Sequence, residues 1–98
     1  MNYILIKNNN LLECFCEEEN FEDIVYDEVG CNAGKRYSSD RNFLIIEDNC
    51  LEGDIVKVNK NFFERGILYG TCIISKPTNH SLTEEEIRNL HNEIQINK

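Results

Sequence analysis

The chain has no tryptophan, a single proline and no apolar run near the ~18 residues that a membrane-spanning helix requires. Its first seven residues are too few for a signal peptide. We therefore expect no membrane segment and a location in the cytoplasm. Internal repeats, low-complexity stretches and shifts of composition that mark a domain boundary are also missing. We expect a single domain over residues 1–98.

The sequence also lacks the short fingerprints of common catalytic sites. It has neither a Gly-x-Gly-x-x-Gly nor a Gly-Lys-Ser/Thr loop for phosphate, and no serine stands in a Gly-x-Ser-x-Gly turn. Its acidic residues form no calcium loop of the Asp-x-Asp-x-Asp-Gly kind. We therefore expect a protein that is not an enzyme and that needs no cofactor or metal.

The cysteines fit neither a disulfide framework nor a zinc site. They are odd in number, and no Cys-x-x-Cys spacing occurs among Cys14, Cys16, Cys31, Cys50 and Cys72. We expect reduced thiols that are mostly buried as small apolar side chains. Cys31, beside Gly30 in an expected loop, is the thiol best placed to be a nucleophile, with His80 or His91 as a base. A Cys31 enzyme is therefore kept as an alternative.

Alternating apolar residues and turn residues predict a mainly β fold. Asn8, Asn9 and Asn10 suit a tight turn, because asparagine tolerates positive φ angles. The turn separates two expected strands, Met1–Lys7 and Leu11–Glu17. We expect further strands at Lys35–Ser38, Phe43–Glu47, Asp54–Asn59 and Gly66–Ser75. The last is apolar on both faces, which is typical of a central strand.

A helix is expected at the C-terminal end. Ser81 and Thr83 each precede a glutamate by three residues, which is the capping-box pattern. Apolar or partly apolar residues follow at helical spacing: Ile87, Leu90, His91 and Ile94. His91 is expected to pack against the apolar face. The expected fold class is α+β, mainly antiparallel β as a small sheet or partly open barrel of about five to seven strands, with one C-terminal amphipathic helix.

The segment Glu18–Val29 is ambiguous. Phe21, Ile24, Val25 and Val29 have helical spacing, but the Ile-Val-Tyr sequence that begins at Ile24 favours a strand. The prediction favours a strand beyond Asp23.

Negative charge is concentrated near the N-terminus. The net charge is −8, and seven of the twelve residues from Glu17 to Glu28 are acidic. Such a surface can bind a basic groove and imitate nucleic acid, with association accelerated by electrostatic steering. Charge runs are common in proteins, and the more usual reason for one is a solvated surface that keeps the protein soluble. The candidate partner-binding residues are Glu17, Glu18, Glu19, Glu22, Asp23, Asp27 and Glu28.

The first functional hypothesis is a small acidic inhibitor that binds a protein partner with a basic groove. The 14 asparagines and 12 isoleucines indicate an AT-rich gene, as in a low-GC bacterium or its phages and mobile elements. Such elements encode anti-CRISPR and other anti-defence proteins that act on nucleic-acid-handling complexes. The hypothesis leaves the partner's identity and the oligomeric state open.

The alternative is a nucleic-acid-associated β-barrel module, in which aromatic rings beside cations hold single strands. The candidate residues for this face are Lys35, Arg36, Lys57, Phe62 and Phe63. Three segments, Gly34–Ser38, Leu51–Val58 and Gly66–Gly70, resemble the N-terminal modules of primosomal replication proteins and similar small phage proteins. The resemblance extends over the stretch from Gly34 to Gly70, about 37 of the 98 residues, and includes the generic Gly-Asp-x-Val-x-Val pattern. It implies an architecture, and no functional residue is carried over.

Overall fold

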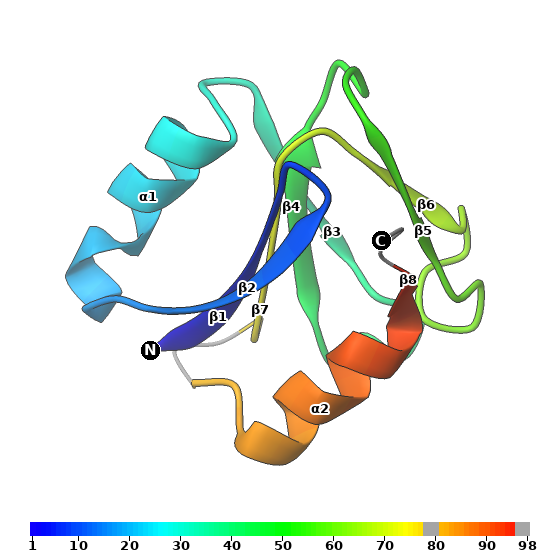
Figure 1. Cartoon of the computed structure of the whole chain (residues 1–98). Helices are drawn as coiled ribbons and strands as arrows, with labels where there is room; N and C mark the ends of the chain where they lie inside the picture. Colours follow the sequence, from blue (N-terminus) through cyan, green and yellow to red (C-terminus); the bar gives the residue numbers. More distant parts are fainter. Residues whose placement is uncertain (78–80, 96–98) are drawn as a thin grey trace.

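A computed structural model describes residues 1–77 and 81–95 of the chain. All strand pairs in these residues are antiparallel. The elements, in chain order (Figure 1), are β1 (Asn2–Lys7), β2 (Asn10–Phe15), the 3-10 helix η1 (Glu18–Asn20), α1 (Phe21–Glu28), β3 (Ala33–Tyr37), β4 (Leu44–Asp48), β5 (Ile55–Val58), β6 (Ile67–Tyr69), β7 (Cys72–Ser75), α2 (Glu84–Glu93) and β8 (Ile94–Gln95).

The strands form two sheets. The larger has the order β2-β1-β7-β4-β3, and the smaller has the order β6-β5-β8. The larger sheet is buried on both faces, since α1 packs against one face and the smaller sheet with α2 covers the other (Figure 1). Its inner strands therefore carry nearly continuous apolar runs, as the sequence of β7 predicts.

The expected N-terminal hairpin is confirmed. β1 and β2 pair from Asn2↔Phe15 to Lys7↔Asn10. Asn8 and Asn9 form the two-residue turn, with φ angles of 52° and 62°. Positive φ at both central residues is the type I′ geometry that matches the twist of paired strands.

The single strand expected over Gly66–Ser75 is wrong. The chain bends at Gly70, so that β6 belongs to the smaller sheet and β7 to the centre of the larger one. Gly70 has a φ of 67°, and a Cβ there would lie 2.9 Å from the Glu52 carbonyl oxygen. Its N–H donates to the Asp54 carbonyl oxygen at 2.8 Å. A glycine at the bend lets one apolar run cross from one sheet to the other.

The strand expected beyond Asp23 is also wrong, because this segment is the helix α1. Phe21 and Val25 lie one turn apart and are buried against the larger sheet. The Phe21 ring packs edge-on against Tyr3, with ring centroids 5.7 Å apart. Packing of the helical apolar face outweighs the local β-propensity of the Ile-Val-Tyr sequence.

The C-terminal helix α2 is confirmed, and its N-cap is Thr83. The Glu86 N–H donates to the Thr83 hydroxyl at 3.1 Å, and the Thr83 N–H donates back to the Glu86 carboxylate at 3.0 Å. Burial alone would raise the pKa of Glu86, but hydrogen bonds from Lys76 and Thr83 hold it below its ordinary value. Ser81 instead accepts a hydrogen bond from the Asn2 N–H at 2.6 Å.

Thr83→Ala is expected to lower the free energy of unfolding by about 0.5–2 kcal/mol, because the Glu86 N–H loses its acceptor, the Thr83 hydroxyl. Thr83→Ser keeps the hydroxyl and is the matched control. Urea unfolding monitored by circular dichroism gives both values. An alanine variant as stable as the serine variant would contradict the role of the cap.

The α+β class with mainly antiparallel strands and a C-terminal helix is therefore confirmed. The described residues hold eight strands rather than five to seven. The additional strands come from the break at Gly70 and from β8, a two-residue strand that pairs with β5 directly after α2. The helix α1, like η1 and β8, is not among the elements expected from the sequence.

Candidate functional site

The acidic residues predicted as a partner-binding site lie on one side of the molecule. Glu17 precedes η1, and the others lie within η1 and α1. Because Phe21 and Val25 turn inward, Glu22, Asp23 and Asp27 lie on the outward face of α1 and are exposed. The helix therefore holds its carboxylates in fixed positions on the surface.

Two of these seven acidic residues have a counter-ion. The Glu28 carboxylate lies 3.0 Å from Lys7 Nζ, and the Glu22 carboxylate lies 3.0 Å from Lys35 Nζ. Within the described part of the chain, the remaining five make no ion pair: Glu17, Glu18, Glu19, Asp23 and Asp27. This surface therefore keeps a local excess of negative charge, which attracts cationic groups at low and moderate salt.

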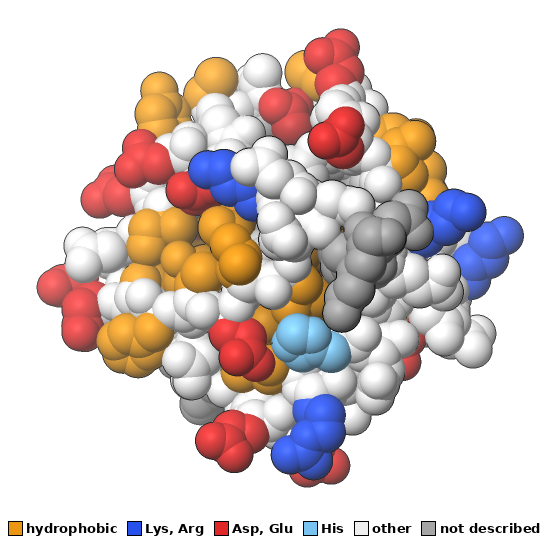
Figure 2. Space-filling model, viewed as in Figure 1, with side chains coloured by type: hydrophobic (Ala, Val, Ile, Leu, Met, Phe, Trp, Pro, Cys, Tyr) orange, Lys and Arg blue, Asp and Glu red, His pale blue; other side chains and the backbone are white. Residues whose placement is uncertain are grey.

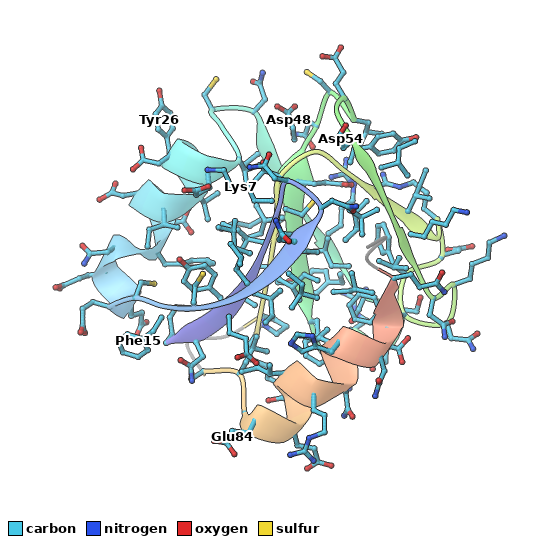
Figure 3. The ribbon with its side chains drawn as sticks, viewed as in Figure 1. Lys7, Phe15, Tyr26, Asp48, Asp54 and Glu84 are labelled. Atoms are coloured by element: carbon cyan, nitrogen blue, oxygen red, sulfur yellow. The ribbon has the colours of Figure 1, made fainter. Side chains whose placement is uncertain are left out.

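Large apolar side chains stand among these charges. Tyr26, on the outward face of α1, is 63% exposed, Phe15 at the end of β2 is 67% exposed, and Leu12 in β2 is 44% exposed. Figure 3 shows Phe15 and Tyr26 pointing away from the core. In Figure 2, hydrophobic side chains gather between α1 and β2, and acidic groups surround them. We call the exposed surface of β2, η1 and α1 the acidic–apolar face.

The apolar part of this face is not among the site residues predicted from the sequence. Phe15 alternates in phase with Glu13 and Glu17, so it falls on the polar side of the predicted strand, and that phase was a usable signal. Tyr26 could not be placed, because its outward direction depends on the segment being a helix. Exposed aromatic residues within a charged surface are typical of protein interfaces.

A groove adjoins the acidic–apolar face between β2 and α2. Its volume is about 560 Å³, and it is lined by Asn2, Glu13, Cys14, Phe15, Glu84, Ile87, Arg88 and His91. His91 Nε2 lies 3.6 Å from Glu13 Oε1, and the His91 side chain is 47% exposed. The expectation that His91 packs against the apolar face of the helix is therefore wrong. Its ring instead lines the groove.

The alternative nucleic-acid face is not assembled as a stacking surface. Phe62 and Phe63 are 6% and 8% exposed and belong to the core between the two sheets. Lys35 is exposed beside Glu22, and Lys57 is exposed on β5. Arg36 is directed toward Glu47, at 3.4 Å. These residues therefore present cations without the exposed rings that base stacking requires.

A buried carboxylate joins the two sheets. Glu47, in β4, is fully buried, and its carboxylate accepts hydrogen bonds from the Arg65 guanidinium and from the Tyr69 N–H, the latter at 3.1 Å. Arg36 Nη1 lies 3.4 Å from Oε1, the carboxylate oxygen that Arg65 also contacts. Both arginines are about one-quarter to one-third exposed. The cluster crosslinks β4 to β6 and is a structural element.

The cysteines are all free, but fewer are buried than expected. Cys16 and Cys72 are buried, Cys14 is half-buried, and Cys31 and Cys50 are exposed on turns. Burial raises the pKa of Cys72 to about 12, and the hydrogen bond with Asp48 raises the pKa of Cys50. His80, one of the two histidines considered as a base for Cys31, lies outside the described residues.

Comparison of the chain with protein-family models, curated proteins and solved structures finds no match. Neither helix of the described chain combines the length and the apolar character needed to cross a membrane. In residues 1–77 and 81–95, no three His, Cys, Asp or Glu side chains are grouped as a metal site requires. Function is therefore inferred from the surfaces themselves.

Proposed function

We propose that the protein is a non-enzymatic binding protein whose acidic–apolar face docks onto a basic groove of a protein partner. One observation carries the proposal: exposed Tyr26 lies between Asp23 and Asp27 on α1, exposed Phe15 precedes the three glutamates at positions 17–19, and these five carboxylates make no ion pair within the described residues. A surface that serves solubility alone has no need of exposed aromatic residues. Aromatic anchors contribute much of the binding energy at interfaces, and surrounding charges set orientation and association rate.

The class of partner follows from the charge. A groove that binds nucleic acid is lined with lysine and arginine, and a rigid array of carboxylates competes for the same cations. The proposed partner is therefore a nucleic-acid-handling complex, and the effect of binding is inhibition, as in anti-CRISPR and other anti-defence proteins. The excess of asparagine and isoleucine, whose codons are rich in A and T, agrees with a phage or mobile element of a low-GC bacterium as its source.

The rigid attachment of α1 also supports binding. Phe21 and Val25 fix the helix to the sheet, so its outward carboxylates are already in place before a partner arrives. A preorganised surface loses little conformational entropy on association. The ion pairs of Glu22 and Glu28 with lysines on β3 and β1 hold the two sides of the helix in the same way.

The partner is identified first by a tagged pull-down from a low-GC bacterial lysate, with and without nuclease. The triple variant Glu18→Gln, Glu19→Gln, Asp23→Asn is then expected to bind this partner at least about tenfold more weakly, with a smaller dependence on salt. These three residues have no ion pair in the described structure, so the fold is expected to keep its melting temperature.

The matched control is Glu52→Gln, Asp54→Asn, Glu64→Gln, which removes the same three charges from exposed positions outside the acidic–apolar face. If the face binds the partner, the control keeps most of the affinity. Equal losses in the two variants would show that only net charge matters and would overturn the proposal. Partners that disappear with nuclease treatment would instead favour the nucleic-acid module.

A further inference from the structure

The strand β2 is an open edge of the larger sheet, and in the described residues it pairs with β1 alone. The Cys16 N–H donates to the Met1 carbonyl oxygen at 3.1 Å, which fixes Met1 and Cys16 as a hydrogen-bonded pair. In an antiparallel ladder, bonded and non-bonded pairs alternate. The backbone N–H and C=O groups of Leu11, Glu13 and Phe15 are therefore directed outward, away from β1.

This edge has few of the features that protect sheet edges from pairing. β2 contains no lysine, no proline and one charged residue, Glu13. Leu12 and Phe15 are exposed large apolar side chains on the same strand. The outward backbone groups, together with these side chains, are what an added strand uses for affinity and specificity.

The groove beside the edge supplies a place for the side chains of an added strand. Phe15 and Ile87 provide its apolar surface, and Glu13 and Glu84 provide carboxylates. Glu84 and Phe15 lie at the same end of the groove (Figure 3). Two cationic or titratable groups, Arg88 and His91, line it as well. Beyond Phe15, the chain continues into Glu17, Glu18 and Glu19, all exposed and without ion pairs in the described structure.

We propose that an extended, basic segment of the partner protein adds to the sheet as a strand beside β2, with its basic side chains on the face of Glu13 and Phe15 and its apolar side chains on the opposite face, beside Leu12. This inference rests on the proposed function and names how that partner is held. Basic side chains on the added strand would face Glu13, Glu84 and the acidic residues that follow β2. Main-chain hydrogen bonds to Leu11, Glu13 and Phe15 would fix its register.

A second copy of this chain fits the β2 edge less well than a basic strand does. Two β2 strands related by a two-fold axis at their centre would place Glu13 opposite Glu13, and like charges directly opposite destabilise a strand pair. Each copy also carries a net charge of −8, which opposes association. A basic strand meets the same edge with attraction instead of repulsion.

The proposal is tested with a synthetic alternating peptide, acetyl-KVKVKVK-amide, and the full chain labelled with ¹⁵N. We expect chemical-shift changes and slowed hydrogen exchange at the amides of Leu11, Glu13 and Phe15. The control peptides are acetyl-EVEVEVE-amide, with the opposite charge, and acetyl-KVKPKVK-amide, which cannot form a complete strand. Equal changes with the proline peptide, or no protection with the basic peptide, would overturn strand addition.

Two variants at Glu13 separate the contribution of the backbone N–H to peptide binding from the contribution of the side-chain charge. Glu13→Gln removes the charge and keeps the N–H, whereas Glu13→Pro also removes an N–H that β1 does not use. We expect the proline variant to bind the basic peptide at least about fivefold more weakly than the glutamine variant, with both folded by circular dichroism. If Glu13→Pro unfolds, the exchange experiment on the unaltered chain still decides.

Strand addition at β2 can fail while the proposed binding by the acidic–apolar face holds, and the experiments tell the two apart. One outcome is that the Glu18/Glu19/Asp23 variant loses its partner, while the β2 amides of the unaltered protein stay unprotected in its complex with that partner. In that case the acidic–apolar face binds the partner and strand addition is wrong. Protection of the β2 amides in the free protein, with a dimer in sedimentation, would show that a second copy occupies the edge, and would also overturn the proposal.

Discussion

Replacing Glu47 with alanine is expected to lower the free energy of unfolding by about 3–5 kcal/mol. The fully buried Glu47 carboxylate accepts hydrogen bonds from the Arg65 side chain and from the Tyr69 backbone N–H. Its removal leaves this N–H without a partner and two partly buried guanidinium groups without an anion. Leaving buried polar and charged groups unpaired is far more costly than losing a surface ion pair.

Urea unfolding of Glu47→Ala, Glu47→Gln and Glu64→Ala measures the effect. Glutamine keeps the shape and one acceptor for Tyr69, so we expect an intermediate loss. Glu64 is exposed, and its alanine variant is expected to lie within about 0.5 kcal/mol of the unaltered protein. A Glu47→Ala variant that loses less than about 1 kcal/mol would show that the cluster does not hold the sheets together.

A double-mutant cycle isolates the contribution of the Arg65–Glu47 pair. In the otherwise unaltered protein, Arg65→Ala is expected to lower the free energy of unfolding. It leaves the buried Glu47 carboxylate with Arg36, 3.4 Å away, as its remaining cation. In the Glu47→Ala background the same change removes an unpaired cation and is expected to cost much less. The difference between the two gives the coupling energy. Additive effects would mean that Arg65 acts through its packing on the Phe63 and Tyr69 rings.

The features that local sequence determines were predicted well. The Asn8–Asn9 turn and the Thr83 capping box each depend on a few neighbouring residues, and both elements are confirmed. The helix α1 and the bend at Gly70 depend on distant contacts. Val25 favours a helix only because Phe21 and Val25 meet the sheet together, and Gly70 separates two strands only because Asp54 and Glu52 lie beside it.

In the candidate site, too, some features follow from the local sequence and others depend on contacts between distant segments. The acidic residues can be read directly from the sequence, and their role as a binding surface stays a prediction. Which of them lack counter-ions depends on the positions of Lys7 and Lys35, which only the fold provides. Tyr26 joins the surface because α1 is helical. The open edge of β2 is a property of strand order, and strand order is set by pairings between distant segments.

Leu90→Ala is expected to lower the free energy of unfolding by about 2–5 kcal/mol. Leu90 is the residue of α2 that is fully buried, and it packs into the core between the two sheets. Its truncation removes apolar contact and leaves a cavity beneath the helix. Ile87, half-buried on the same helix, is the matched comparison, and Ile87→Ala is expected to cost less.

The Leu90 variant also tests how the groove is built. α2 forms one wall of the groove beside β2, and Leu90 is its main attachment to the core. Hydrogen exchange is therefore expected to accelerate in α2 more than in the β1–β2 hairpin of the Leu90→Ala protein, because the hairpin is held by its own ladder and by β7. Binding of the basic peptide should weaken in parallel. Equal acceleration in both elements would instead show that α2 and the sheet unfold as one cooperative unit, so that the groove cannot open without loss of the fold.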